Sequence, residues 1–316
     1  MAQDLNGKTA IVTGAGSGIN FCFARLLLSR GVNVLVADLA LRPEAKELIN
    51  THSKDSPRAV YLKTDVTSWL DLSRTFQVAH QEFGGVDIVC PGAGIFEPPY
   101  SNFWRPPGQL PSKDDPQSNH YACLDINITH PIRLTQLAIS YFVSAKPKVS
   151  PTNPKSIIHI SSITAQLTLL PLPLYCASKH AISGFVRSLA HLESTLGIRV
   201  AAVAPAIVKT PIWTSEKLVM IKAEDEWVLP EDVADVMVDL VEKTEISSYF
   251  GENAEQGEMI RIGGGSVIEV AKGRLRDVQT LNDPGPSGPG TTASGMAELY
   301  EGVYGLLQIE GWGNPS

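Results

Sequence analysis

Short apolar runs alternate with longer amphipathic segments along most of this 316-residue chain. The short runs read TAIVT, VNVLVA, AVYLK, VDIVC, SIIHI and RVAAVAP, with a late EMIRI. Between them, apolar residues recur with helical spacing near residues 18–30, 43–51, 68–83, 117–144, 175–196 and 231–242. Apolar strands without polar alternation indicate a parallel sheet covered on both faces, whose right-handed crossovers wind helices onto each side. The pattern therefore predicts an α/β fold, a doubly wound parallel sheet of about seven strands in one domain over residues 5–272.

Other segments interrupt this alternation. Residues 97–120, rich in Pro, follow the carboxyl end of the fourth strand, the side on which such sheets bind ligands. We expect this loop and a second one, 206–229, to enclose a substrate, and residues 144–156 to form a surface loop on the opposite side. Residues 273–316 form a C-terminal extension in which 282–295 has the composition of a flexible Gly/Pro-rich linker. Its last apolar stretch is expected to dock as a lid, on a partner subunit or on the chain's own surface.

The overall composition argues against several classes of function. A net charge of −7 without basic clusters disfavours a nucleic-acid surface. The apolar windows are too short, or too often interrupted by Pro, for a secretory signal or a membrane span. The four cysteines lack CxxC spacing and the histidines lack metal-ligand spacing, so we expect reduced thiols and no metal site. These features favour a cytoplasmic protein that contacts neither nucleic acid nor membrane.

The stretch TGAGSGIN, residues 13–20, joins the first strand to the first helical segment. A glycine-rich turn at a helix N-terminus presents backbone N–H groups to a phosphate. Gly14 would make the tight turn, and Gly16 and Gly18 would let the backbone approach a pyrophosphate. Asn20 stands where a last glycine would allow close packing of helix and strand, so we expect the helix to stand off slightly or the amide to cap a carbonyl.

Asp38 ends the second strand, close to the position about 20 residues after the glycine loop at which a carboxylate accepts from ribose hydroxyls. A 2′-phosphate would meet this negative charge, and the nearest cation, Arg42, lies in the next turn. NAD is therefore expected in preference to NADP. Asp38 also suits a plain helix cap or turn, and its place at a strand end fits both interpretations.

Tyr175 and Lys179 are four residues apart in YCASK, and therefore on one face of a helical segment. A tyrosine with a pKa of about 10 is a poor acid or base at neutral pH, and a neighbouring ammonium would lower that pKa. Ser162 follows the strand SIIHI, where its hydroxyl would meet that of Tyr175 across one substrate oxygen. Together the three residues would polarise a carbonyl or hold an alcohol.

A series of motifs in this order resembles the short-chain dehydrogenases/reductases: TGAGSGIN, TDV at 64–66, PGAG at 91–94, LDINITHP, ISS at 160–162, YCASK and PAIVKTP at 205–211. The resemblance covers residues 5–272 and implies a single Rossmann-type domain. YCASKH and Asp38 resemble NAD-linked members of the 15-hydroxyprostaglandin dehydrogenase kind. The Pro-rich insertions and the Gly/Pro tail resemble members from fungal secondary metabolism. The family also implies a homodimer or homotetramer, paired through helices 117–144 and 175–196.

The resemblance assigns roles to individual residues. Tyr175 would be the acid/base, Lys179 would lower its pKa and bind the nicotinamide ribose, and Ser162 would hold the substrate oxygen. Asn127 would anchor a water in a proton relay behind Lys179, or, on its residue type alone, simply bend its helix. The expected cofactor-binding residues are Gly14, Gly16, Ser17, Gly18, Ile19, Asp38, Asp65, Val66, Gly92, Ala93, Gly94, Tyr175, Lys179, Pro205, Val208 and Thr210.

The chain departs from the family pattern at three positions, all outside the Ser–Tyr–Lys set. Asn20 replaces the last glycine of the loop, Gly92 stands where the family has Asn, and Ala206 replaces a glycine after Pro205. We expect these changes to affect cofactor affinity or loop position rather than the chemistry.

The leading hypothesis is an NAD(P)-dependent oxidoreductase that interconverts a secondary alcohol and a ketone on a hydrophobic small molecule. Hydride would pass to or from the nicotinamide while Tyr175 moves the proton. Two alternatives stay open. One is a non-redox cyclase or isomerase that keeps the cofactor as a structural element, and the other is a cofactor-sensing binding protein without turnover.

Overall fold

The computed structural model describes residues 3–280, 287–291, 295, 298–299 and 301–302. Its strands are β1 (Thr9–Thr13), β2 (Asn33–Asp38), β3 (Ala59–Lys63), β4 (Ile88–Cys90), β5 (Lys155–Ile160), β6 (Ile198–Pro205), β7 (Glu245–Ser247), β8 (Met259–Arg261), β9 (Val267–Ala271) and β10 (Arg274–Asp277). Its α-helices are α1 (Gly18–Ser29), α2 (Pro43–Thr51), α3 (Trp69–Phe83), α4 (Ala122–Leu124), α5 (His130–Ser144), α6 (Pro173–Ser188), α7 (His191–Leu196), α8 (Ser215–Leu218) and α9 (Pro230–Glu242). A π-helical turn η1 (Asp125–Thr129) and two 3₁₀ turns, η2 (Ile163–Gln166) and η3 (Gly251–Gln256), complete the elements.

An eight-stranded sheet in the order β10-β9-β6-β5-β4-β1-β2-β3 forms the centre of the molecule. All neighbouring strands pair in parallel except β10, which pairs with β9 in antiparallel register. The strand order reverses between β1 and β4, and ligands bind at such a switch point, outside the carboxyl ends of the strands. The predicted doubly wound α/β fold is confirmed.

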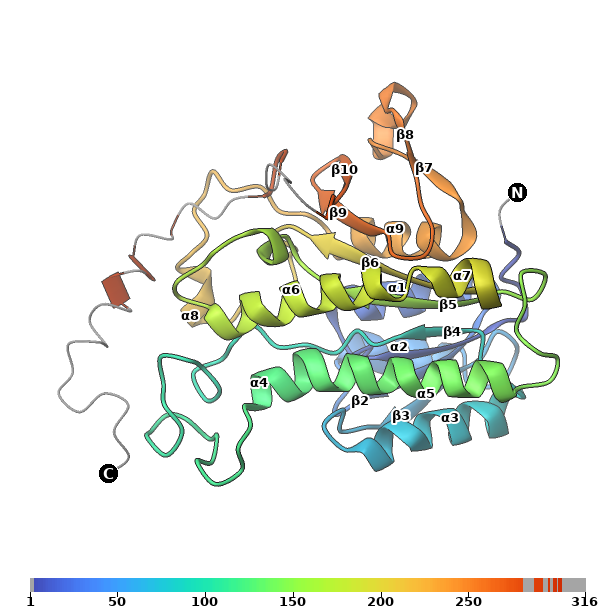
Figure 1. Ribbon diagram of the computed structural model, residues 1–316, viewed down its shortest axis with the longest axis horizontal. Helices are drawn as coiled ribbons and strands as arrows, with labels where there is room; N and C mark the ends of the chain where they lie inside the picture. Colours follow the sequence, from blue (N-terminus) through green and yellow to red (C-terminus); the bar gives the residue numbers. More distant parts are fainter. Residues whose placement is uncertain (1–2, 281–286, 292–294, 296–297, 300, 303–316) are drawn as a thin grey trace.

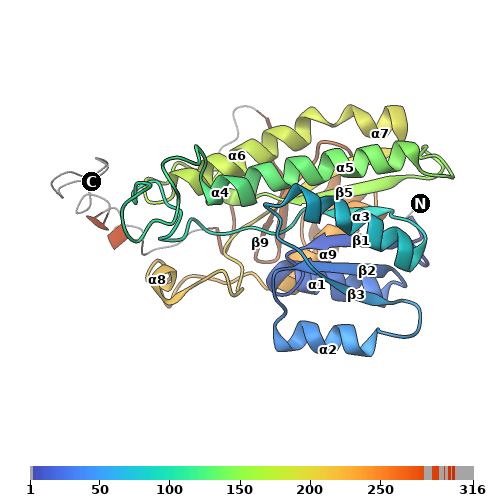
Figure 2. The same cartoon turned by 90° about the horizontal axis from the view of Figure 1, so that it is seen from below.

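Helices cover both faces of this sheet, as the views in Figure 1 and Figure 2 show. Buried residues of α1 and α9, such as Phe23 and Met237, pack with one face of the strands. Buried residues of α3, α5 and α6, such as Leu72, Leu134 and Ile182, pack with the other. Because strands buried on both faces need apolar residues on both sides, β1 has all five of its residues buried.

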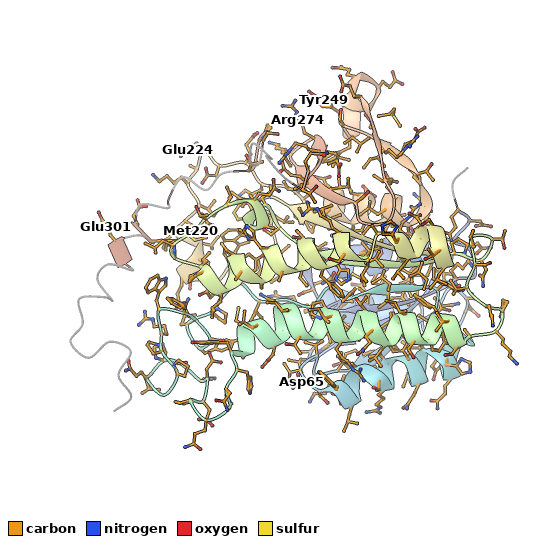
Figure 3. All side chains as sticks on the ribbon, in the orientation of Figure 1. Asp65, Met220, Glu224, Tyr249, Arg274 and Glu301 are labelled. Carbon is orange, nitrogen blue, oxygen red and sulfur yellow. The ribbon has the colours of Figure 1, made fainter. Side chains whose placement is uncertain are left out.

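The late run EMIRI does not enter the main sheet. It contributes β8, which pairs with β7 in a separate antiparallel ribbon, and the seventh parallel strand is β9 instead. Arg274 of β10 stacks on the ring of Tyr249 at 5.0 Å, which joins the ribbon to the sheet edge (Figure 3). The alternating run around EMIRI suits a half-exposed ribbon, whereas VIEVA in β9 is buried throughout.

Part of the C-terminal extension lies against the domain. Pro289 O accepts from Lys272 N at 3.0 Å, and Gly290 O accepts from Ile207 N at 3.0 Å. Thr291, 8% exposed, follows directly. Within the predicted linker, residues 282–286 and 292–294 lie outside the described residues, as does nearly all of the apolar stretch beyond it. None of the helices in the described part of the chain is long and apolar enough to cross a membrane.

Candidate active site

A pocket of about 1140 Å³ opens at the carboxyl ends of the central strands. Expected site residues that line it are Gly14, Ser17, Gly18, Ile19, Asp38, Val66, Gly92, Ala93, Gly94, Ser162, Tyr175, Lys179, Pro205, Val208 and Thr210. Residues of both expected substrate loops line it as well, among them Pro99 and Tyr100 in one and Ile212 and Trp213 in the other. The fold therefore brings segments far apart in the chain to one cavity.

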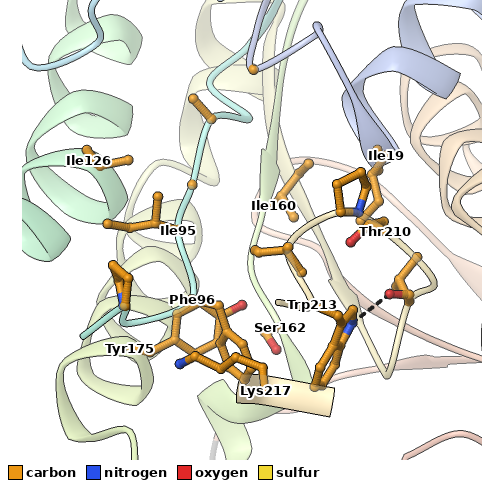
Figure 4. Close-up of a pocket in the computed structure, with 18 of the residues that line it drawn as sticks. Ile19, Ile95, Phe96, Ile126, Ile160, Ser162, Tyr175, Thr210, Trp213 and Lys217 are labelled. Carbon is orange, nitrogen blue, oxygen red and sulfur yellow. Dashed lines mark hydrogen bonds between the residues drawn. The ribbon is translucent and has the colours of Figure 1, made fainter. Parts of the chain in front are cut away.

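Ser162 and Tyr175 face each other on one wall of this pocket (Figure 4). Ser162 lies two residues after the end of β5. Its hydroxyl accepts from Thr164 N at 3.2 Å, and this contact caps the turn η2. Tyr175 lies in the first turn of α6, a helix that begins at Pro173. The Ser162 hydroxyl lies close enough to the phenol to lower the pKa of Tyr175. A substrate oxygen placed between them would receive two hydrogen bonds.

Lys179 lies one helical turn after Tyr175 and is buried. Its ammonium is 5.4 Å from the centroid of the Tyr175 ring and donates to Ile160 O at 2.9 Å. Burial lowers the pKa of Lys179 to about 8. The β5 carbonyl and the spacing within α6 therefore fix the cation against the phenol.

The pKa of Tyr175 itself does not follow the sequence-based expectation. The ring keeps part of its surface open to the pocket, yet burial raises its pKa above the ordinary value, and the hydrogen bond with Ser162 offsets only part of that rise. The expected lowering by Lys179 is wrong for this structure, because desolvation disfavours the phenolate more than the neighbouring groups stabilise it. The phenol of Tyr175 is thus protonated at neutral pH.

Asn127 lies in the π-helical turn η1, between α4 and α5. Its Oδ1 accepts from Ile95 N at 2.9 Å and its Nδ2 donates to Ile95 O at 2.8 Å. The side chain therefore braces the segment that leaves β4 towards the pocket. The proton-relay role that the resemblance implies stays a prediction.

The glycine loop has the geometry of a phosphate-binding turn. Gly14 has φ +72°, and a Cβ there would lie 2.7 Å from Ala93 Cα, so only glycine fits. Gly18, the first residue of α1, has φ +62° and lies against Thr210 in the loop that follows β6. Among the described residues no side chain caps α1, and its first turn holds no acidic residue. The N–H groups of that turn are left available to an anion.

Asp38, the last residue of β2, lies beside this loop. Its Oδ2 accepts from Gly16 N at 2.8 Å, and its Oδ1 accepts from Ala40 N at 3.3 Å. Gly16 thus supports the carboxylate rather than lining the pocket. Asp65 does not line it either, because its carboxylate accepts from the backbone N–H and the hydroxyl of Thr67. Val66 beside it does.

Thr13 and His130 support the PGAG segment, residues 91–94, through a chain of hydrogen bonds. Thr13 Oγ1 accepts from Gly92 N at 3.0 Å and Ala93 N at 3.3 Å. His130 Nε2 lies 3.1 Å from the same hydroxyl, and its Nδ1 donates to Ile126 O. Burial lowers the pKa of His130 to about 4, so the ring is neutral and acts as a structural brace.

Asn20 occupies space that two glycines leave open. A Cβ on Gly14 would lie 3.0 Å from Asn20 Nδ2, and one on Gly92 would overlap Asn20 Oδ1. The Cys90 thiol donates to the same oxygen at 3.7 Å. The expected stand-off of the helix is therefore replaced by an inserted side chain. Asn20 and Gly92, two departures from the family pattern, are complementary in shape.

Sequence reasoning missed several residues in the pocket wall or directly behind it. Glu97 is 1% exposed at φ +37°, and its carboxylate accepts from Tyr175 N at 2.8 Å and Phe103 N at 3.1 Å. Lys217 of α8 reaches across to Glu97 O, and Thr291 adds a residue from the C-terminal extension. A carboxylate beside Phe96 in the apolar stretch after β4 was the only signal. Two of its partners, Tyr175 and Lys217, are distant in sequence.

Trp104 lies in the Pro-rich loop 97–120. Trp104 Nε1 donates to Leu170 O at 2.7 Å, which ties the Pro-rich loop to the segment before α6. Trp104 therefore anchors the loop. In the described part of the chain no group of three or more His, Cys, Asp or Glu side chains has the arrangement of a metal site.

Comparisons with known proteins agree with this geometry. The family described as short chain dehydrogenase matches residues 8–218. The 15-hydroxyprostaglandin dehydrogenase [NAD(+)] of Rattus norvegicus is 31% identical, and the hydroxynaphthalene reductase-like protein Arp2 of Metarhizium guizhouense is 32% identical; each alignment covers 67% of this chain and 72% of the relative. The 3-ketoacyl-(acyl-carrier-protein) reductase of Brucella melitensis, solved with NADH, superposes with a TM-score of 0.62 over 84% of this chain and 97% of that one, at 22% identity. On the family match and the two relatives above, this chain is a member of the short-chain dehydrogenase family of oxidoreductases.

Proposed function

We propose that this protein is an NAD-linked dehydrogenase/reductase that interconverts a secondary alcohol and a ketone on a hydrophobic small molecule. The observation that carries the proposal is the pair of hydroxyls of Ser162 and Tyr175, which face each other on the wall of a pocket whose lining is mostly apolar. Lys179 beside the Tyr175 ring adds the cation that a phenolate needs.

The residues around the glycine loop fit a dinucleotide. The uncapped first turn of α1 and the glycine backbone at Gly14 and Gly18 suit a pyrophosphate. Asp38 at the far end suits ribose hydroxyls and disfavours a 2′-phosphate, which supports NAD over NADP. The relative from Rattus norvegicus is an NAD(+) enzyme by name, which supports the same choice. When bound, the nicotinamide would supply the acceptor or donor of hydride.

The chain's own residues would supply binding and proton transfer. Ser162 and Tyr175 would each donate a hydrogen bond to a ketone oxygen, which polarises the carbonyl. Tyr175 Oη would then pass its proton to that oxygen, and Lys179 would stabilise the resulting phenolate. Because burial raises the pKa of Tyr175, the tyrosine starts in the protonated form that reduction requires. Oxidation would use the reverse transfer and would gain from higher pH.

Broader assignments follow from the family alone. We propose a cytoplasmic homodimer or homotetramer with a role in fungal secondary metabolism. The exposed Ile132 and Val143 of α5 suit a subunit contact on that helix.

The test is turnover of NAD(H) with a panel of hydrophobic secondary alcohols and their ketones, followed by the absorbance of the reduced nicotinamide. We expect activity with NAD(H) that exceeds the activity with NADP(H). Tyr175→Phe should lower kcat by at least about a thousandfold, since it removes the group that moves the proton, and calorimetry should find NAD binding unchanged. Tyr249→Phe, at the sheet edge away from the pocket, is the matched control.

Two results would point elsewhere. Full activity of Tyr175→Phe would exclude the proposed acid/base. Conversion of a substrate without change in the nicotinamide would indicate a cyclase or isomerase, and NAD binding without conversion of any panel member would indicate a cofactor-sensing protein.

A further inference from the structure

Lys217 places a cation inside the pocket. It belongs to the short helix α8, whose other residues are exposed, but its own side chain turns inward. The ammonium donates to Glu97 O at 2.9 Å and lies 4.3 Å from the centroid of the Phe96 ring. An ammonium has three donors, and the structure shows one protein acceptor for it.

No side chain forms an ion pair with this cation within the described part of the chain. The nearby Glu97 carboxylate is already held by Tyr175 N and Phe103 N, so that only its main-chain carbonyl meets Lys217. Glu216, the neighbour in α8, lines the pocket and raises the pKa of Lys217, but its carboxylate is exposed and forms no ion pair with Lys217 among the described residues. Burial lowers the pKa of Lys217 to about 8, partly offset by Glu97. At pH 7 the side chain therefore remains mostly charged.

The cation lies close to the reacting atoms but separated from them by an aromatic ring. Phe96 contacts Tyr175 edge-on, with ring centroids 4.7 Å apart, and contacts Trp213 at 5.2 Å. Figure 4 shows Lys217, Phe96 and Tyr175 along the same side of the pocket. A molecule whose oxygen meets Tyr175 would cover Phe96 with its apolar part and bring its far end to Lys217.

We propose that Lys217 binds a carboxylate of the substrate, so that the substrate class is a hydrophobic hydroxy or keto acid. The carboxylate and the reacting carbon would be separated by a short apolar stretch that spans the Phe96 ring. A partly desolvated ammonium with free donors gains most from an anionic acceptor. This inference rests on the proposed function, because the reacting carbon is placed by Ser162 and Tyr175.

The test uses oxodecanoates with the ketone at successive carbons from C4 to C7, each paired with its uncharged primary amide. With NADH, at least one acid should have a KM lower than its amide by roughly ten- to hundredfold, the usual worth of a hydrogen bond to a charged group. Lys217→Met should abolish this preference and leave the KM of the amide and kcat within a few-fold. Lys217→Arg should restore most of it.

Lys222→Met is the control, since Lys222 is exposed in the same loop and does not line the pocket. It should keep the preference for the acid. The KM of the acid should also rise above pH 8 in the wild-type protein, where Lys217 loses its charge, while that of the amide should not.

Equal KM values for acid and amide in the wild-type protein would overturn the proposal. So would an equal rise of both in Lys217→Met, which would make Lys217 only a tie between the two loops. If no panel member is reduced, the proposed function fails separately, and calorimetry then decides on Lys217. Tighter binding of acid than amide, lost in Lys217→Met, would support the inference, and equal binding would refute it.

Discussion

At the scale of single residues, the pair Asn20 and Gly92 shows how two departures from a family pattern compensate each other. The family resemblance puts Gly at position 20 and Asn at position 92, and this chain has the reverse. The Asn20 amide fills the space that a side chain at 92 would take. The Asn20 side chain, from α1, therefore fills the space that the family's Asn would fill from position 92.

This exchange predicts strong coupling between the two positions. Asn20→Gly should lower the free energy of unfolding because it leaves a gap, and Gly92→Asn should lower it more because the two amides would overlap. The double variant should recover about 1–3 kcal/mol relative to the sum of the single changes. Urea denaturation of the four proteins measures this value, and simple additivity would contradict the proposed complementarity.

At the scale of elements, Glu97 joins the Pro-rich loop to the helix that carries Tyr175 and Lys179. Leu172, the N-cap residue of α6, makes no side-chain cap hydrogen bond. The Glu97 carboxylate takes that place from a distant segment through Tyr175 N. Burial raises its pKa, and these N–H contacts counteract the rise. Glu97 is thus a positioning residue that acts through α6.

Glu97→Ala should reduce kcat by about tenfold or more, because small displacements of a catalytic group have large effects, and should change KM less. Glu97→Gln keeps an acceptor oxygen and should recover much of the lost kcat. A purely structural role would instead lower the fraction of folded protein and leave kcat per active site unchanged. Active-site titration with NAD, together with steady-state kinetics of both variants, separates the two cases.

At the scale of the whole molecule, two buried histidines link folding to pH. Burial lowers the pKa of His130 to about 4 and that of His159 to about 3, both from an ordinary value of 6.5. Below pH 6.5 these two histidines are protonated in the unfolded chain but stay neutral in the folded chain. The free energy of unfolding therefore falls as the pH drops from 6.5 towards 4. Each such proton contributes about 1.4 kcal/mol per pH unit.

His159→Gln should make this acid loss of stability shallower, since one of the two groups is removed. His159 Nδ1 has no hydrogen-bond partner in the described structure, so the substitution removes no hydrogen bond at that atom. Urea denaturation between pH 7 and pH 4.5 checks the slope, with the exposed His191→Gln as control. An identical slope in all three proteins would show that other groups govern acid unfolding.

The sequence allowed prediction of features that depend on local periodicity and on fixed spacing. The sheet and its layers follow from apolar runs, and Ser162, Tyr175 and Lys179 meet because strand ends and helical turns place them in known directions. Three features were not predictable. The β8 run EMIRI resembles a core strand in composition, the Tyr175 pKa depends on burial, and the Glu97 contacts join segments distant in the chain. Each of these is a property of tertiary packing.

The short stretch Ser287–Thr291 contacts the domain, so the chain cannot be shortened to residue 272 without loss of these contacts. Cutting the gene after residue 272, where the sequence pattern suggests that the domain ends, would delete β10 and uncover the sheet edge at β9. It would also remove the hydrogen bond from Ile207 N to Gly290 O, and it would remove Thr291 from the pocket wall. In a protein shortened in this way the apolar pocket would be open to water. The substrate specificity measured for it would therefore differ from that of the full chain.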